Sequence, residues 1–140
     1  MTLLDTDHFT VMANEGFTGH ERLSDRLRRR SEPAHLPVIV VDEQLQGWLA
    51  RIHKARSKPL RIESYDRFIK LLLTLRKWQI ERWDDQAATQ FHDLRTSGVR
   101  IPSQDLRIAS IARTRDALLL TRNARDFSRV PGLRFESWLD

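Results

Sequence analysis

The chain has 140 residues, 40% of them hydrophobic, no cysteine and a formal net charge of +5. This length suits a single domain, residues 1–140, with one sizeable core, and the absence of cysteine excludes disulfides, thiolate metal sites and cysteine nucleophiles. The opening residues lack the basic and then apolar order of a signal peptide. No apolar run approaches the roughly 20 residues of a membrane span, so we expect a soluble, cytoplasmic protein with no membrane partner.

The apolar pattern of the first half predicts strands that alternate with helices. In chain order we expect a buried strand at 3–5, a short helix, a basic helix at 20–30, a connector at 32–36, a buried strand at 38–41 and a helix over 45–52. The segment Val38–Val41 is assigned to a strand because it is continuous, apolar and β-branched. Asp42 is then expected to cap the helix that follows.

The second half continues the alternation. After a break at 57–59 we expect a helix capped by Ser64, an edge strand within 78–83, a helix opened by Asp84 or Asp85 and closed by Gly98, a central helix capped by Ser103, a buried strand at 117–121 and an edge strand at 133–138. Strands that alternate with helices predict an α/β fold, in which helices flank a parallel sheet.

Polar residues follow several of these strands. Asp5, Glu43 and the pair Asn123 and Asp126 come after three strands, and Asp105 lies in the first turn of the central helix. Ligands of open parallel sheets bind beyond the carboxyl ends of the strands, so we expect these side chains to meet. Carboxylates gathered in this way repel one another unless a divalent cation binds them, and all-oxygen ligands favour Mg²⁺ or Mn²⁺.

Each acid also has a simpler interpretation. An aspartate at a helix start is most often a cap, and a glutamate such as Glu43 is often a surface residue. His8 is either a base that contacts phosphate or an ordinary polar residue. The arginine-rich charge fits a nucleic acid, a solvated helix face or an acidic partner protein. The functional argument therefore depends on the whole set of acids at one edge of the sheet.

Four segments resemble the motifs of VapC-type PIN domains, the toxin halves of bacterial toxin–antitoxin pairs. They are L-L-D-T-D at 3–7, V-V-D-E-Q-L-Q-G-W at 40–48, I-P-S-Q-D-L-R-I-A at 101–109 and L-T-R-N-A-R-D-F at 120–127. The similarity runs from residue 3 to residue 138 in the family's order. Asp7 stands where the family usually has asparagine, and Asp42 adds an acid beside Glu43.

The resemblance implies a PIN-like three-layer sandwich with a mostly parallel, twisted sheet of four to five strands flanked by helices. It implies a homodimeric endoribonuclease that uses Mg²⁺ or Mn²⁺, cleaves RNA and is neutralised by a cognate antitoxin. It assigns metal ligation and catalysis to Asp5, Glu43 and Asp105, with Asp126 or Asn123 completing the ligand set. Asn123 is alternatively a residue that hydrogen-bonds Asp5 or a water on the ion. Thr121 and Arg122 are candidate substrate-binding residues.

Three other functions are compatible with the sequence. Asp5-Thr6-Asp7 also resembles the D-x-D nucleophile of haloacid-dehalogenase phosphatases, which would form an aspartyl-phosphate. A degenerate PIN domain would bind nucleic acid or protein without cleaving it. A PIN-type nuclease without an antitoxin would serve RNA processing or DNA repair.

Overall fold

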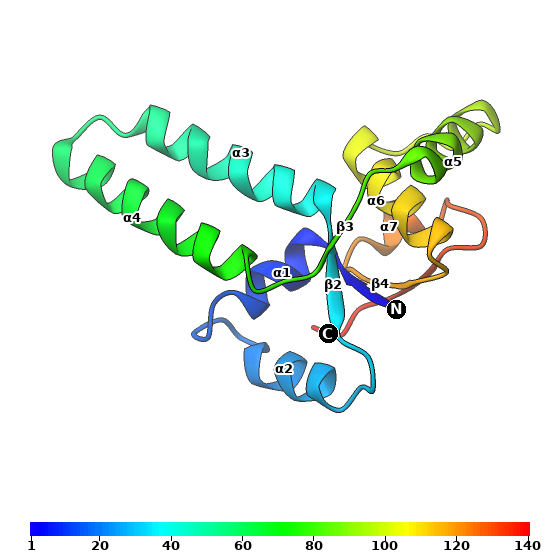
Figure 1. Ribbon diagram of the computed structural model, residues 1–140, viewed down its shortest axis with the longest axis horizontal. Coiled ribbons are helices and arrows are strands. Elements are labelled where there is room, and N and C mark those ends of the chain that lie inside the picture. Colours follow the sequence, from blue (N-terminus) through cyan, green and yellow to red (C-terminus); the bar gives the residue numbers. More distant parts are fainter.

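The computed structural model describes residues 1–140 as a five-stranded sheet flanked by helices (Figure 1). All four strand pairings are parallel, and the order across the sheet is β3-β2-β1-β4-β5. The strands are β1 (Thr2–Leu4), β2 (Ala34–Pro37), β3 (Ile80–Glu81), β4 (Leu118–Leu120) and β5 (Arg134–Glu136). The expected α/β fold with a parallel central sheet is confirmed.

Seven helices connect the strands. They are α1 (Thr6–Met12), α2 (His20–Arg28), α3 (Val38–Lys54), α4 (Lys58–Leu75), α5 (Asp85–Thr96), α6 (Ser103–Thr114) and α7 (Ala124–Phe127). The long helices α3 and α4 pack against each other as a hairpin that projects from the sheet, and α5 packs against α6 on the other side (Figure 1). None of the helices is long and apolar enough to cross a membrane.

The centre of the core lies at strands β1 and β4 and helix α6. Leu3, Leu4, Leu119 and Leu120 are fully buried, because a central parallel strand is covered on both faces. Helix α6 buries most of its apolar positions, as expected for a central helix. The acids that follow β1 and β4 are therefore attached to the most deeply buried strands.

The predicted boundary between the second strand and its helix is wrong. The strand is β2, Ala34–Pro37, which begins inside the expected connector at 32–36, and Val38–Val41 form the first turn of α3. Pro37 has no N–H to continue the sheet, and Ile39 and Val40 bury their side chains from the helix instead. A β-branched run indicates burial, which a strand and a buried helix turn share.

Three predicted helix caps are also wrong. Asp42 lies inside α3, where its carboxylate accepts hydrogen bonds from Gln46 and Gln104. Ser57 caps α4 by accepting a bond from the Leu60 amide at 3.2 Å, whereas Ser64 lies within that helix. The N-cap of α6 is Pro102 and not Ser103. The other predicted elements are present with small shifts at their ends.

Candidate active site

The acids gather where the chain leaves the middle of the sheet. Asp5 directly follows β1, and Thr121 directly follows the neighbouring strand β4. From this pair of strands the sheet extends to β2 and β3 on one side and to β5 on the other. Such a reversal of strand order opens a crevice at the carboxyl ends of the two strands, where open α/β sheets bind ligands.

Asp5 is held in one orientation by two hydrogen bonds. Its Oδ1 accepts a bond from the Thr6 amide at 2.7 Å and so caps α1, and its Oδ2 accepts one from the Thr121 hydroxyl at 2.7 Å. Burial raises the pKa of Asp5, the nearby charge of Asp7 adds to the rise, and the Thr121 bond opposes it. Asp5 is only 7% exposed, so its carboxylate is costly to ionise without a cation.

Glu43 reaches the site from the second turn of α3. The Thr6 hydroxyl donates a 3.2 Å hydrogen bond to its Oε1, which links it to the residue beside Asp5. Burial raises the pKa of Glu43, and the charges of Asp5 and Asp42 raise it further. The structure thus places Glu43 against the residue that follows Asp5, and a helix and not a strand end delivers it.

Asp105, Asn123 and Asp126 form the other side of the site. The Asn123 amide nitrogen donates to Asp105 Oδ2 at 3.3 Å and to Asp126 Oδ2 at 3.0 Å. The Asn123 Oδ1 accepts a bond from the Asp126 backbone N–H at 3.3 Å and caps α7. Burial raises the pKa of Asp105 to about 6, and the charges of the neighbouring acids contribute, those of Asp5 and Glu43 first.

The donor set fits a divalent cation. No lysine or arginine forms an ion pair with the four acids, which are Asp5, Glu43, Asp105 and Asp126. The four acids offer only oxygen donors, which Mg²⁺ or Mn²⁺ prefers, and the Asn123 amide nitrogen lies between Asp105 and Asp126. As the side chains lie, no three acids or histidines are close enough to coordinate one ion directly. An ion here would rely on water ligands as well, which is usual for Mg²⁺.

Asp7 and His8 form a buried link and are not free for chemistry. The fully buried His8 accepts the Trp138 backbone N–H at Nε2, 3.0 Å away, so its Nδ1 carries the proton and faces Asp7 Oδ1 at 2.6 Å. Asp7 Oδ2 accepts the Arg122 amide at 2.8 Å. Burial raises the pKa of Asp7, but the bonds from His8 and Arg122 outweigh it, and the pKa lies below its usual value.

Two sequence interpretations are affected by this link. His8 is too buried to act as a base, so the simpler interpretation of it holds. Both oxygens of Asp7 are hydrogen-bonded to the protein, which leaves no free second acid beside Asp5 for a D-x-D phosphatase.

The two candidate substrate-binding residues differ in position. Thr121 is 1% exposed, and its hydroxyl orients Asp5, so it acts on the site from within the protein. The Arg122 side chain is exposed and pairs with Asp140 at 3.2 Å, which leaves its guanidinium at the protein surface. Sequence reasoning missed Thr6 as the residue that joins Asp5 to Glu43. Its position directly after Asp5, in the first turn of α1, was the available signal.

Solved structures share this fold. No protein-family profile and no curated protein sequence matches the chain. A chain of VapBC2 from Rickettsia felis, bound to a promoter DNA fragment, is 24% identical with a TM-score of 0.75 and 98% of both chains covered. A chain of DNA-bound VapBC from Salmonella typhimurium is 22% identical with a TM-score of 0.73 and 99% of both covered. A chain of a toxin–antitoxin complex from Klebsiella pneumoniae is 19% identical, with a TM-score of 0.68 and coverage of 99% and 98%. The chain therefore has the PIN-like fold of these proteins.

Proposed function

We propose that this protein is a metal-dependent endoribonuclease of the VapC type, the toxin of a toxin–antitoxin pair. The observation that carries the proposal is the convergence of Asp5, Glu43, Asp105 and Asp126 without a neutralising side chain. These acids come from four separate segments that meet only in the folded chain. The fold shared with chains of VapBC and toxin–antitoxin complexes supports it.

The residues have distinct roles in this proposal. Asp5, Glu43, Asp105 and Asp126 would hold Mg²⁺ or Mn²⁺, which when bound activates a water for attack on phosphorus and neutralises phosphate charge. Thr121 and Thr6 keep Asp5 and Glu43 in place by the hydrogen bonds they donate. Asn123 holds Asp105 and Asp126 together through its amide nitrogen. These three polar residues orient the ligands and do not themselves react.

An antitoxin partner is supported by the surface of α4. This helix exposes a set of large apolar side chains: Leu60, Ile62, Tyr65, Ile69, Leu72 and Leu73. An exposed apolar surface of this kind marks a site of protein–protein contact. We propose a cognate antitoxin there and keep the homodimer as a further expectation, to be measured by light scattering with and without the antitoxin.

The central test is RNA cleavage by the purified protein with Mg²⁺ and with EDTA. We expect Mg²⁺-dependent cleavage that Asp5→Asn and Asp105→Asn each abolish, and growth arrest on expression that the same variants relieve. Asp116→Asn is the matched control, because Asp116 is exposed and its positive φ of 48° is one that asparagine tolerates. Cleavage that ignores EDTA, or that survives both active-site variants, would rule out the proposal.

A further inference from the structure

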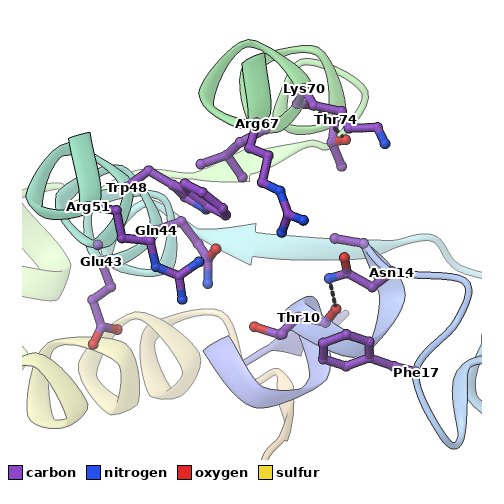
Figure 2. Close-up of a pocket in the computed structure, with 13 residues that line it drawn as sticks. Thr10, Asn14, Phe17, Glu43, Gln44, Trp48, Arg51, Arg67, Lys70 and Thr74 are labelled. Carbon is purple, nitrogen blue, oxygen red and sulfur yellow. Dashed lines mark hydrogen bonds between the residues drawn. The ribbon is translucent and has the colours of Figure 1, made fainter. Parts of the chain in front are cut away.

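A groove of about 520 Å³ opens beside the acids, between α3, α4 and the region of α1. Figure 2 shows Glu43, Gln44, Trp48 and Arg51 along α3 and Arg67 on α4 facing the hollow. Thr10, Asn14 and Phe17 form the opposite wall. Glu43 belongs both to this groove and to the acid cluster, so the groove continues from the candidate active site.

The charge of the groove is opposite to that of the acid cluster. Three cations, Arg51, Arg67 and Lys70, line it against the single acid Glu43. Arg51 lies over the Trp48 ring at 4.5 Å, and Arg67 has only an exposed pair with Glu63 at 3.0 Å. A surface pair of this kind is weak, so Arg67 can exchange it for a phosphate.

The wall opposite Arg67 carries an aromatic side chain in the α1–α2 loop. Phe17 is 49% exposed, although a phenylalanine usually buries its ring. An exposed ring across a groove from arginines is the arrangement on which single-stranded nucleic acids stack a base while cations hold the backbone.

Gly47 lines the same groove from α3. It stands in the middle of a 17-residue helix, where glycine costs about 1 kcal/mol relative to alanine. A Cβ at this position would meet nothing within 4 Å, so the fold itself does not require glycine there. The missing side chain leaves the helix backbone open to the groove.

We propose that this groove binds the single-stranded RNA next to the bond that is cleaved, with phosphates on Arg67 and Lys70 and a base on Phe17. The inference rests on the proposed ribonuclease function and adds where the substrate strand lies. A strand whose phosphate sits at the acids must continue over a neighbouring surface, and the cationic groove that begins at Glu43 is complementary to it.

Binding is measured separately from cleavage, in the Asp5→Asn background, by the anisotropy of a fluorescein-labelled single-stranded oligoribonucleotide. We expect Phe17→Ala to weaken binding roughly 5- to 150-fold, the range for one lost base stack. Arg67→Gln with Lys70→Gln should reduce the slope of log K against log salt by about 1.4. Arg76→Gln with Lys77→Gln is the matched control outside the groove and should leave the slope unchanged.

Gly47→Leu separates occupancy of the groove from damage to the fold. The leucine fills open space, so the melting temperature should not fall, while RNA binding should be lost, and Gly47→Ala should retain binding. The groove variants could bind RNA with the affinity and salt dependence of their parent while the protein with Asp5 intact cleaves RNA. In that case this inference is wrong and the proposed function stands. If they bind RNA normally but lose neutralisation by the antitoxin, the groove belongs to the protein partner. If the parent neither binds nor cleaves RNA, both proposals fail.

Discussion

At Asp105, burial and then the repulsion by neighbouring acids raise the pKa, so that stability depends on pH. The folded-state pKa of about 6 lies above the usual aspartate value of 3.8, because burial and the nearby acids disfavour the ionised form. An acid whose folded-state pKa is raised stabilises the folded protein fully below its unfolded-state pKa. This stabilisation is lost as the pH rises through the folded-state pKa. The metal-free protein should therefore lose stability between about pH 4 and pH 6.

Asp105→Asn should remove this loss. In EDTA the variant should melt at a higher temperature than the parent at pH 7.5, and the gap should shrink at pH 5, where the parent acid is already protonated. Adding Mg²⁺ should stabilise the parent more than the variant. Thermal melts at the two pH values, with and without Mg²⁺, measure this. A gap of equal size at both pH values would contradict the assignment.

The structure changes the expectation for Asn123. If Asn123 served only as a ligand, Asn123→Asp would offer the ion another carboxylate. The Asn123 amide nitrogen, however, donates to both Asp105 and Asp126, and an aspartate would replace that donor with a third negative charge. We expect Asn123→Asp to lower stability in EDTA and to need more Mg²⁺ for RNA cleavage. Asp126→Asn should also weaken cleavage but should not lower metal-free stability.

The measurement for these two variants is a Mg²⁺ titration of cleavage beside a melt in EDTA. If the Asn123→Asp variant needs the same Mg²⁺ concentration for cleavage and melts at the same temperature as the parent, the hydrogen bonds of Asn123 do not matter at the site.

At the scale of single elements, the start of α4 distinguishes two serines. Ser57 caps the helix through the Leu60 amide, whereas the Ser64 hydroxyl donates to the Leu60 carbonyl inside the helix. Ser57→Ala should cost about 1 kcal/mol of the free energy of unfolding. Ser64→Ala should be neutral or slightly stabilising, because alanine is the better helix former. Urea denaturation of the two variants tests the assignment, and a larger loss for Ser64→Ala would reverse it.

Helix α3 illustrates how an element can be recognised while its start is misplaced. The helical spacing of Leu45, Trp48 and Ile52 predicts the helix, but the preceding apolar run Val38–Val41 was assigned to a strand. Only pairing with β1, which places Ala34 and His35 opposite Thr2 and Leu3, shows that the strand comes earlier. Glu43 consequently reaches the site from a helix.

At the scale of the whole molecule, His8 connects the first helix to the last residues of the chain. It accepts the Trp138 N–H and faces Asp7, which in turn accepts the Arg122 N–H. His8→Leu leaves the Trp138 N–H without a partner and removes the ring bond to Asp7 Oδ1, which keeps only the backbone N–H of residue 8. We expect a loss of about 1–3 kcal/mol in the free energy of unfolding. His92→Leu is the control on an exposed helix face and should change stability little.

Hydrogen exchange gives a local readout of the same link. The Trp138 amide should exchange faster in His8→Leu than in the parent. Unchanged exchange together with unchanged stability would mean that the His8 bond does not hold the C-terminal segment.

The sequence by itself determined the α/β class, the central strands β1 and β4, and the acids that would meet at the carboxyl ends of the strands. These features follow from local apolar periodicity and from the shared polarity of parallel strands. Only the tertiary structure decided the boundary at Pro37, because an apolar run reports burial and not backbone conformation. It also decided the hydrogen-bond partners of Asn123, Thr121 and His8. Their partners Asp105, Asp5 and Trp138 lie on other elements, up to 130 residues away in the chain, and no local pattern encodes these pairs.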